Sequence, residues 1–257
     1  MSKDTIQAYG ELCGLFYDAT EQYAPSIEVD FFASFIEKNP GRVLEPMSGS
    51  GRLQIPLMQR GYVVDGVDHS SAMLEHCLQR CASLGLKKPE LYEQSLENFV
   101  LPHKYSTMII GVGSFQLITD RDLALKSLKN LNSHMLVGGN LLIDIFVPDT
   151  TVDDFSVSVA RLDEHRSIRL TKRHIFNVAK KMADSFCLYE LIVDGVVQQQ
   201  ENALIEIVWR SDDEWSQLLL EAGFEIIRIY EEKFKEPSRI IQARPIKHFN
   251  KGLIKYF

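Results

Sequence analysis

Cysteine is scarce in this chain of 257 residues, and its four cysteines, Cys13, Cys77, Cys81 and Cys187, form no CxxC pair. Structural metal sites use closely spaced cysteine and histidine ligands, and disulfide scaffolds need more cysteine than this. The seven histidines show no ligand-like pairing either. We therefore predict that the protein binds no metal and keeps its thiols reduced, as cytoplasmic proteins do.

Long apolar segments are also missing. The longest apolar runs, residues 108–112 and 141–147, are far shorter than the roughly 20 residues that cross a bilayer as a helix. The first ten residues are polar and lack the apolar core of a signal peptide. These absences predict a cytoplasmic protein without a membrane partner.

The chain also lacks a surplus of basic residues. The chain has 28 Lys and Arg against 35 Asp and Glu, which gives a net charge of -7. Binding to nucleic acid depends on a basic surface that neutralises phosphates, so we do not expect a nucleic-acid partner. The hydrophobic content of 45% is ordinary for a globular protein.

Short β-branched runs alternate with longer helical stretches through the first part of the chain, which predicts an α/β fold with a mostly parallel sheet and helices on both faces. Two helices are expected first, over residues 5–18 and 27–38. The expected strands then follow at 42–45, 62–67, 91–94, 107–112 and 140–147, with helices between most of them.

After Pro148 the spacing of hydrophobic residues changes towards the alternation that is typical of strands. Residues 156–210 read as an antiparallel insertion of three or four strands, with Asp194–Gly195 as a two-residue hairpin turn. A helix up to residue 222 and strands at 224–230 and 239–243 then complete the α/β pattern. We predict a single domain over residues 1–257 that contains this insertion.

A glycine turn joins the first expected strand to a helix, in the sequence from Val43 to Leu53. Ligands of open α/β sheets bind at the carboxyl ends of the strands, where this turn lies. Gly49 and Gly51 let the backbone approach a ligand, although a plain tight turn would also use them.

Two acidic residues add to this turn. Asp68 ends the second expected strand, where a carboxylate can accept hydrogen bonds from both hydroxyls of a ribose, or cap the next helix. Asp65 lies on the same strand but faces the other way. Glu45 precedes the turn, and Gln54 occupies the place of the third glycine of a dinucleotide fingerprint. A carboxylate suits a positively charged nucleoside better than a diphosphate.

The stretch from Glu45 to Gly51, followed by Asp68, resembles motifs of the class I S-adenosylmethionine (SAM)-dependent methyltransferases. Further segments of the chain are similar to later motifs of this family: residues 91–99, 108–115, 135–140 and 221–225. The resemblance implies a Rossmann-like seven-stranded sheet that is mostly parallel, with an antiparallel last hairpin. It also implies SAM as the cofactor and S-adenosylhomocysteine as the product.

The resemblance implies a set of cofactor-binding positions along these motifs. They are Glu45, Met47, Gly49, Gly51, Asp68, His69, Met73, Ser95, Leu96, Gly111 and Gly113. By analogy with the family, Glu45 orients the methionine amino end and Asp68 holds the ribose. Ser95 stands where the family usually has an acidic residue beside adenine.

The segment around Tyr17 resembles an N-terminal element of small-molecule methyltransferases that act on glycine-like amines and amino sugars. The resemblance implies that residues 1–38 form a helical lid and that the acceptor is a small-molecule amine or hydroxyl compound. It is also compatible with a homodimer. Tyr17 is the candidate catalytic residue, although an aromatic packing role is equally open. Among further bases, His134, His165, His174 and Asp144, spacing distinguishes none.

Two other functions stay open on the sequence. Ser95 and the Met47–Ser48 pair leave room for a SAM-binding regulatory module without catalysis. A nucleotide-dependent Rossmann oxidoreductase is the other alternative, against which Glu45 and the missing third glycine count.

Overall fold

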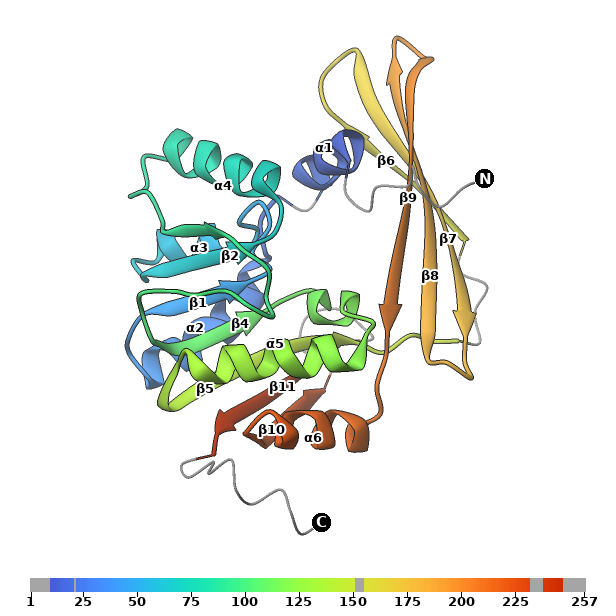
Figure 1. The fold of residues 1–257 in the computed structure, drawn as a ribbon. Coiled ribbons are helices and arrows are strands. Elements are labelled where there is room, and N and C mark those ends of the chain that lie inside the picture. The colour runs from blue at the N-terminus through green and yellow to red at the C-terminus, as the bar shows by residue number, and fades with distance from the viewer. Residues whose placement is uncertain (1–9, 21, 151–154, 232–237, 247–257) are drawn as a thin grey trace. The chain divides into compact units, whose positions relative to one another are not determined.

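The computed structural model describes residues 10–20, 22–150, 155–231 and 238–246. The chain divides into two compact units, each built from two separate segments (Figure 1). The first unit comprises residues 1–24 and 147–209, and the second comprises 25–146 and 210–257. The predicted organisation as one domain with a helical lid stays a prediction.

The second unit contains a seven-stranded sheet in the order β10-β11-β5-β4-β1-β2-β3. Its strands are β1 (Val43–Pro46), β2 (Val64–Asp68), β3 (Leu91–Glu93), β4 (Tyr105–Ile110), β5 (Met135–Phe146), β10 (Phe224–Glu231) and β11 (Ser238–Pro245). The pairs from β5 to β3 are parallel, whereas β11 runs antiparallel to both β5 and β10. The predicted Rossmann-like sheet with an antiparallel last hairpin is therefore confirmed.

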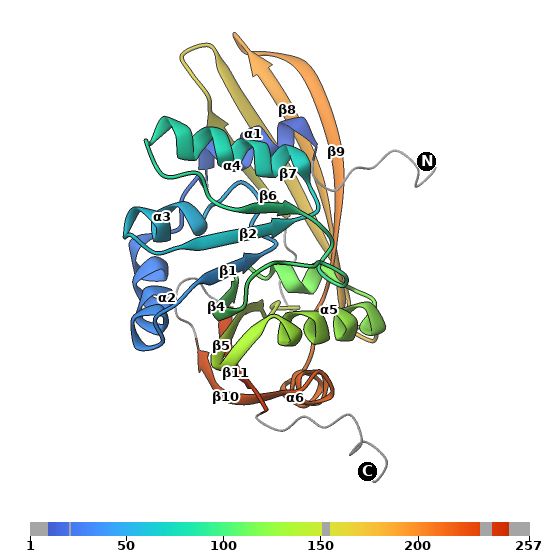
Figure 2. The ribbon, with the colours of Figure 1, turned by 60° about the vertical axis from the view of Figure 1, so that its left-hand side comes forward.

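Helices cover both faces of this sheet, and Figure 2 shows α2 and α5 on opposite sides of the strands. The helices are α2 (Ser26–Lys38), α3 (Gln54–Gln59), α4 (Ser71–Ser83), α5 (Arg121–Ser133) and α6 (Asp212–Glu221), with a 3-10 turn η2 (Ser114–Leu117). Side chains on successive strand residues point to opposite faces, so alternate positions of β4 and β5 face the two helical layers.

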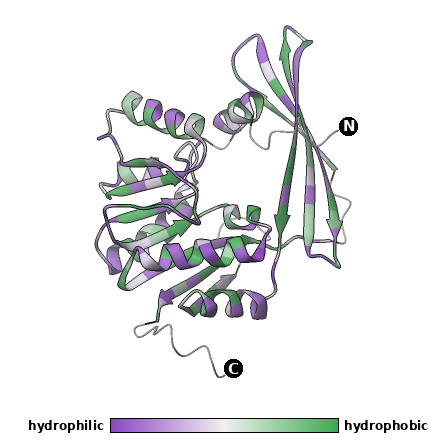
Figure 3. Ribbon diagram, in the orientation of Figure 1, coloured by the Kyte–Doolittle hydropathy of each residue, from purple (hydrophilic) through white to green (hydrophobic). Residues whose placement is uncertain are grey.

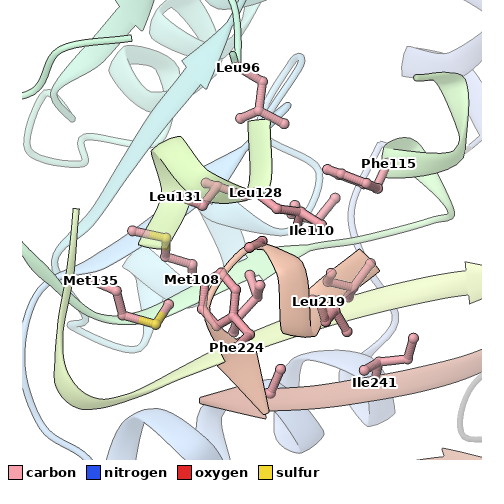
Figure 4. Packing of buried hydrophobic residues seen from close by; sticks show 14 of the residues in the cluster. Leu96, Met108, Ile110, Phe115, Leu128, Leu131, Met135, Leu219, Phe224 and Ile241 are labelled. Atoms are coloured by element: carbon pink, nitrogen blue, oxygen red, sulfur yellow. The ribbon is translucent and has the colours of Figure 1, made fainter. Parts of the chain in front are cut away.

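The main core lies between the sheet and helices α5 and α6 (Figure 4). Met108 and Ile110 of β4 meet Leu128 and Leu131 of α5, and all four are fully buried. Phe224 of β10 joins the same cluster. Hydrophilic and hydrophobic residues alternate along α5 and α6, as expected for helices with one buried side (Figure 3). The core fixes the strands whose carboxyl ends carry the candidate site.

The first unit is an antiparallel sheet in the order β6-β7-β8-β9 with helix α1 (Glu11–Thr20) on one face. Its strands are β6 (Phe155–Arg161), β7 (Arg166–Asn177), β8 (Met182–Val193) and β9 (Val196–Val208). The Glu201 carboxylate of β9 accepts the backbone N–H groups of Leu12 and Cys13, which satisfies free donors at the start of α1.

The predicted hairpin turn at Asp194–Gly195 is confirmed, because both residues have positive φ, 48° and 81°, and join β8 to β9. Two predicted strands are shifted. The fourth strand ends at Ile110 instead of residue 112, since Val112 adopts a left-handed φ of 47°. The fifth begins at Met135, so Gly138 and Gly139 lie within it.

The first predicted helix, 5–18, begins at Glu11 in the structure, and residues 5–9 lie outside the described residues. Across the described part of the chain, no helix is long and apolar enough to cross a membrane.

Candidate functional site

The turn after β1 is held by backbone hydrogen bonds and by left-handed residues. Met47, Gly49 and Gly51 have φ angles of 60°, 51° and 83°. The Ser48 N–H donates to the Val67 carbonyl at 3.2 Å, which ties the turn to β2. A Cβ at Gly49 would meet no atom within 4 Å, so this position is open to a ligand.

Gly51 has a different surrounding from Gly49. A Cβ built there would lie 2.6 Å from the Cys77 sulfur of α4. The glycine therefore allows α4 to pack closely against the turn, a structural requirement that exists with or without a ligand.

Asp68 lies at the end of β2, where its carboxylate ties the turn to α4. Its Oδ2 accepts the N–H of Gly49 at 2.8 Å, and its Oδ1 accepts the N–H of Ser70 at 2.9 Å. Ser70, not Asp68, is the N-cap of α4, because its side chain accepts the Met73 N–H. Each carboxylate oxygen can accept more than one hydrogen bond, so Asp68 keeps capacity for ligand hydroxyls.

Asp65, on the same strand, is held by hydrogen bonds from side chains of the protein itself. Its side chain is 1% exposed and accepts two hydrogen bonds from Arg42, at 2.6 and 3.0 Å, and one from the Tyr105 hydroxyl at 3.0 Å. The bidentate arginine pair satisfies its charge. The prediction that Asp65 faces away from the turn therefore agrees with its partners.

Glu45 lies on β1 and is almost fully buried, with 6% exposure. Its Oε2 has no hydrogen-bond partner. Burial raises the pKa of this carboxyl well above its usual range, and nearby Glu28 and Asp68 raise it further while Arg52 opposes them. An unsatisfied buried carboxyl is costly and marks a place where a ligand can supply the missing donor.

A buried ion pair joins α2 to the turn region. The Arg52 guanidinium donates to both carboxylate oxygens of Glu28, at 2.9 and 2.7 Å, and Glu28 is 2% exposed. This pair anchors the start of α2 beside Glu45. Acids outnumber cations in the group formed by Glu28, Glu45, Asp144 and Arg52, because the same Arg52 acts on both Glu45 and Asp144.

Asp144 lies near the end of β5, on the sheet face opposite the α5 core. It is 6% exposed; its Oδ2 accepts the Val112 N–H at 3.0 Å, and its Oδ1 has no partner. Burial, with a contribution from Glu28, raises the pKa of Asp144 to about 7. Its protonation therefore changes near neutral pH, which makes it a candidate acid or base.

The loop after β4 carries backbone strain beside Asp144. Val112 has a φ of 47°, which is rare for a β-branched residue, and Gly113 follows with 69°. A Cβ at Gly111 would have only the Glu28 carboxylate nearby, at 3.9 Å. Left-handed residues thus occur in the loops after both β1 and β4, which is typical of ligand sites.

The remaining predicted cofactor positions also follow strand ends. His69 is exposed, with its Nδ1 at 3.5 Å from Asp68, and Met73 is half-buried in the first turn of α4. Ser95 is half-buried after β3, whereas the side chain of Leu96 belongs to the main core. The structure thus brings the predicted positions to one edge of the sheet, at the ends of β1, β2, β3 and β4. Tyr17 belongs to the first unit, on α1, and is 37% exposed.

Among the described residues, one group has the spacing of metal ligands: Asp65, Glu90 and His103. Arg42 donates to both of the carboxylates, at 2.6 Å to Asp65 and 2.5 Å to Glu90. A guanidinium between the acids already supplies the positive charge that a metal would bring.

Three site residues were not predicted as such from the sequence. Glu28 and Arg52 carry no motif of their own, and Asp144 was one base among several. Arg52, directly after the glycine turn, gave the one local signal, since it follows the acidic Glu45 closely in sequence, but its partner in the structure is Glu28. The pairing of α2 with the turn depends on tertiary packing, which one sequence does not encode locally.

Comparison with known proteins supports the predicted resemblance to methyltransferases. Residues 43–139 match the family described as "Methyltransferase domain". Comparison with curated proteins by sequence finds no match.

Solved structures show the same fold. A sugar N-methyltransferase, KedS8 from a Streptoalloteichus species, is 18% identical over 96% of this chain and 99% of its own, with a TM-score of 0.77. A SAM-dependent methyltransferase from Clostridium acetobutylicum is 17% identical over 91% and 97%, with a TM-score of 0.74. CalS10, an amino pentose methyltransferase from Micromonospora echinaspora, is 14% identical over 93% and 98%, with a TM-score of 0.73. Residues 43–139 therefore match a methyltransferase-domain family, the chain shares the fold of these methyltransferases, and the predicted resemblance is confirmed.

Proposed function

We propose that this class I methyltransferase transfers the methyl group of SAM to an amino group of a small molecule. The observation that carries the proposal is the buried Glu45 carboxyl, whose Oε2 has no partner at the end of β1. A site with surplus acid suits a ligand that carries an ammonium and a sulfonium. A diphosphate would bring neither a positive charge nor a hydrogen-bond donor to this group.

The donor side fits this ligand along the strand ends. Asp68, with spare acceptor capacity, would hold the ribose hydroxyls, and the open backbone at Gly49 would lie against the ligand. Gln54, in the third-glycine position of a dinucleotide fingerprint, is fully buried and donates to the Val64 carbonyl at 2.9 Å. Its side chain fills the space between helix and strand that the third glycine of that fingerprint would leave for close packing.

The acceptor side follows from the strand order. With the ribose at β2 and the ammonium at β1, the next strands in the sheet are β4 and β5. Asp144 of β5 has a buried oxygen without a partner there, beside the strained Val112. We assign it to the acceptor amine.

The reaction needs orientation and exclusion of water more than it needs acid-base groups, because the sulfonium supplied by SAM is already activated. The amine lone pair forms the new N–C bond as the S–C bond breaks. An amine that enters as an ammonium must first lose a proton, and the Asp144 carboxylate can take it because its pKa lies near 7. Tyr17 stays a candidate residue from the first unit.

The choice of an amine rests on two supports. Two of the structural neighbours are named as a sugar N-methyltransferase and an amino pentose methyltransferase. The net charge of -7 disfavours a polyanionic acceptor. We also propose a cytoplasmic location and a homodimer, which cell fractionation and light scattering would test.

The decisive experiment measures transfer of labelled methyl from SAM to four acceptor pools: amino sugars and other small amines, small hydroxyl compounds, bulk protein, and tRNA with rRNA. We expect label in the amine pool. Label in a macromolecule alone would refute the proposal, and tight SAM binding without transfer to any pool would favour a regulatory SAM-binding module.

The role of Asp144 has its own test. The kcat of the wild type with an amine should rise with pH through about 7, and Asp144→Asn should lower kcat and remove this limb. SAM affinity should change little in the variant. An unchanged pH profile in Asp144→Asn would remove Asp144 from the acceptor side.

A further inference from the structure

A cavity lies within the second unit at the amino end of β5. Its volume is about 450 Å³, which is in the range of small-molecule sites. It is lined by the end of α2 and by residues of β10 and β11, among them Lys38, Arg228, Asn140 and Arg244. Asn140 and Asp144 are four residues apart on β5, so the cavity is roughly 13 Å along the strand from the candidate methyl-transfer site.

The cavity is basic in an acidic protein. Three of its lining residues are Lys38, Arg228 and Arg244, and none of its described lining residues is acidic. None of these cations forms an ion pair among the described residues of the chain. Lys38 and Arg228 lie over the rings of Phe35 and Tyr230, at 6.0 and 4.8 Å from the ring centres, which leaves their positive charge unneutralised.

Hydrogen bonding gives the cavity a surplus of donors. The Asn140 Oδ1 accepts from Gln242 at 2.8 Å and from Arg244 at 3.2 Å. The Gln242 Oε1 accepts from the Tyr230 hydroxyl at 3.0 Å. Asn140 and Gln242 are 3% and 5% exposed, so this buried floor uses its amide oxygens internally. The groups left for a ligand are mainly N–H donors and cations, which select an anion.

An aromatic wall adds an apolar side. Phe35 of α2 and Tyr230 of β10 pack edge to face at 5.9 Å, and Ile227 lies beside them in the lining. An inorganic ion would use only the basic half of a cavity of this volume. We propose that the cavity binds a small phosphorylated organic compound, with its phosphate on Arg228, Arg244 and Lys38 and its organic part against the aromatic wall.

The proposal is tested by calorimetry on the intact protein with uridine diphosphate, glucose 1-phosphate, inorganic phosphate and uncharged uridine. We expect the two organic phosphates to bind more tightly than inorganic phosphate, and uridine to bind least. Binding should weaken with salt, because charge dominates it. Binding should persist with saturating S-adenosylhomocysteine, so its outcome does not depend on the proposed methyl transfer.

Charge-matched variants separate a site from general attraction. Arg244→Gln and Arg228→Gln should each weaken uridine diphosphate binding by roughly tenfold, the loss expected for one charge-assisted contact. Lys129→Gln, which removes an exposed cation from α5, should leave it unchanged. Equal effects of all three variants, competition by S-adenosylhomocysteine, or no binding of either organic phosphate would overturn the proposal.

Discussion

Two aspartates of β2, three residues apart, have different partners and should have separate effects when replaced. Asp68 accepts two backbone N–H groups around the glycine turn, whereas Asp65 is enclosed by Arg42 and Tyr105. Asp68→Ala should weaken SAM binding at least roughly tenfold, because a charge-assisted hydrogen bond is worth about 1.5–3 kcal/mol. Calorimetric titration with SAM measures this change.

Asp65→Ala is the matched comparison. It leaves the Arg42 guanidinium without its buried partner, so it should lower the melting temperature and change SAM affinity less than Asp68→Ala does. Equal losses of SAM affinity in the two variants would remove Asp68 from the ribose.

Asp144 should also affect stability in a pH-dependent way. Its folded-state pKa of about 7 lies above the usual value of 3.8, so the folded state binds more protons between these values. The resulting stability is complete below about pH 4 and is lost as the pH rises through 7. The melting temperature of the wild type relative to Asp144→Asn should therefore fall across this range, measured by calorimetry from pH 4 to 8. A difference independent of pH would contradict the raised pKa.

Helix α2 contributes to the site through one residue, Glu28, which raises the pKa of both Glu45 and Asp144. Glu28→Gln removes this negative charge and frees Arg52 to act on the remaining acids. The rise in kcat with pH should then shift to lower pH than in the wild type. Asp30→Asn serves as the control, because Asp30 lies on the same helix and pairs with Arg60 at the surface. A shift of equal size in both variants would exclude a specific role for Glu28.

Helix α6 begins with a capping box in which the Ser211 side chain and the Glu214 side chain each bond the other's backbone N–H. Ser211→Ala should cost about 1 kcal/mol of stability. For a chain of this size that corresponds to a fall of roughly 2–4 °C in melting temperature. Glu214→Gln, which can keep the capping box, should cost less. Equal losses would show that the charge of Glu214 contributes as much to the stability of the helix as the Ser211 cap does.

At the scale of elements, the sequence allowed the prediction of most of this fold. Alternation of strands and helices, the Asp194–Gly195 turn and the change of period after Pro148 are local signals, and the structure agrees with them. The end of β4 was missed because a valine with a φ of 47° is held there by its surroundings. The charged neighbours of Glu45 were missed because Glu28 of α2 comes near it only through tertiary packing.

Across the whole molecule, the four cysteines are free and buried. Burial raises the pKa of Cys13 to about 11 and also raises those of Cys77, Cys81 and Cys187. The native protein should therefore react with a thiol reagent at neutral pH more than roughly a hundredfold more slowly than free cysteine. All four thiols should react in concentrated guanidinium, as counted by absorbance. One thiol that reacts rapidly in the native protein would contradict this burial.

The position of β11 affects the order in which the molecule can be completed during synthesis. This strand is the last among the described residues, yet it lies between β5 and β10 and pairs with both. A nascent chain that lacks residues 238–245 exposes the edge of β5 and leaves β10 without its partner strand, so the sheet can close only after residue 245 has been synthesised. A stop codon before residue 238 should consequently yield an aggregation-prone chain in which the edge of β5 is open.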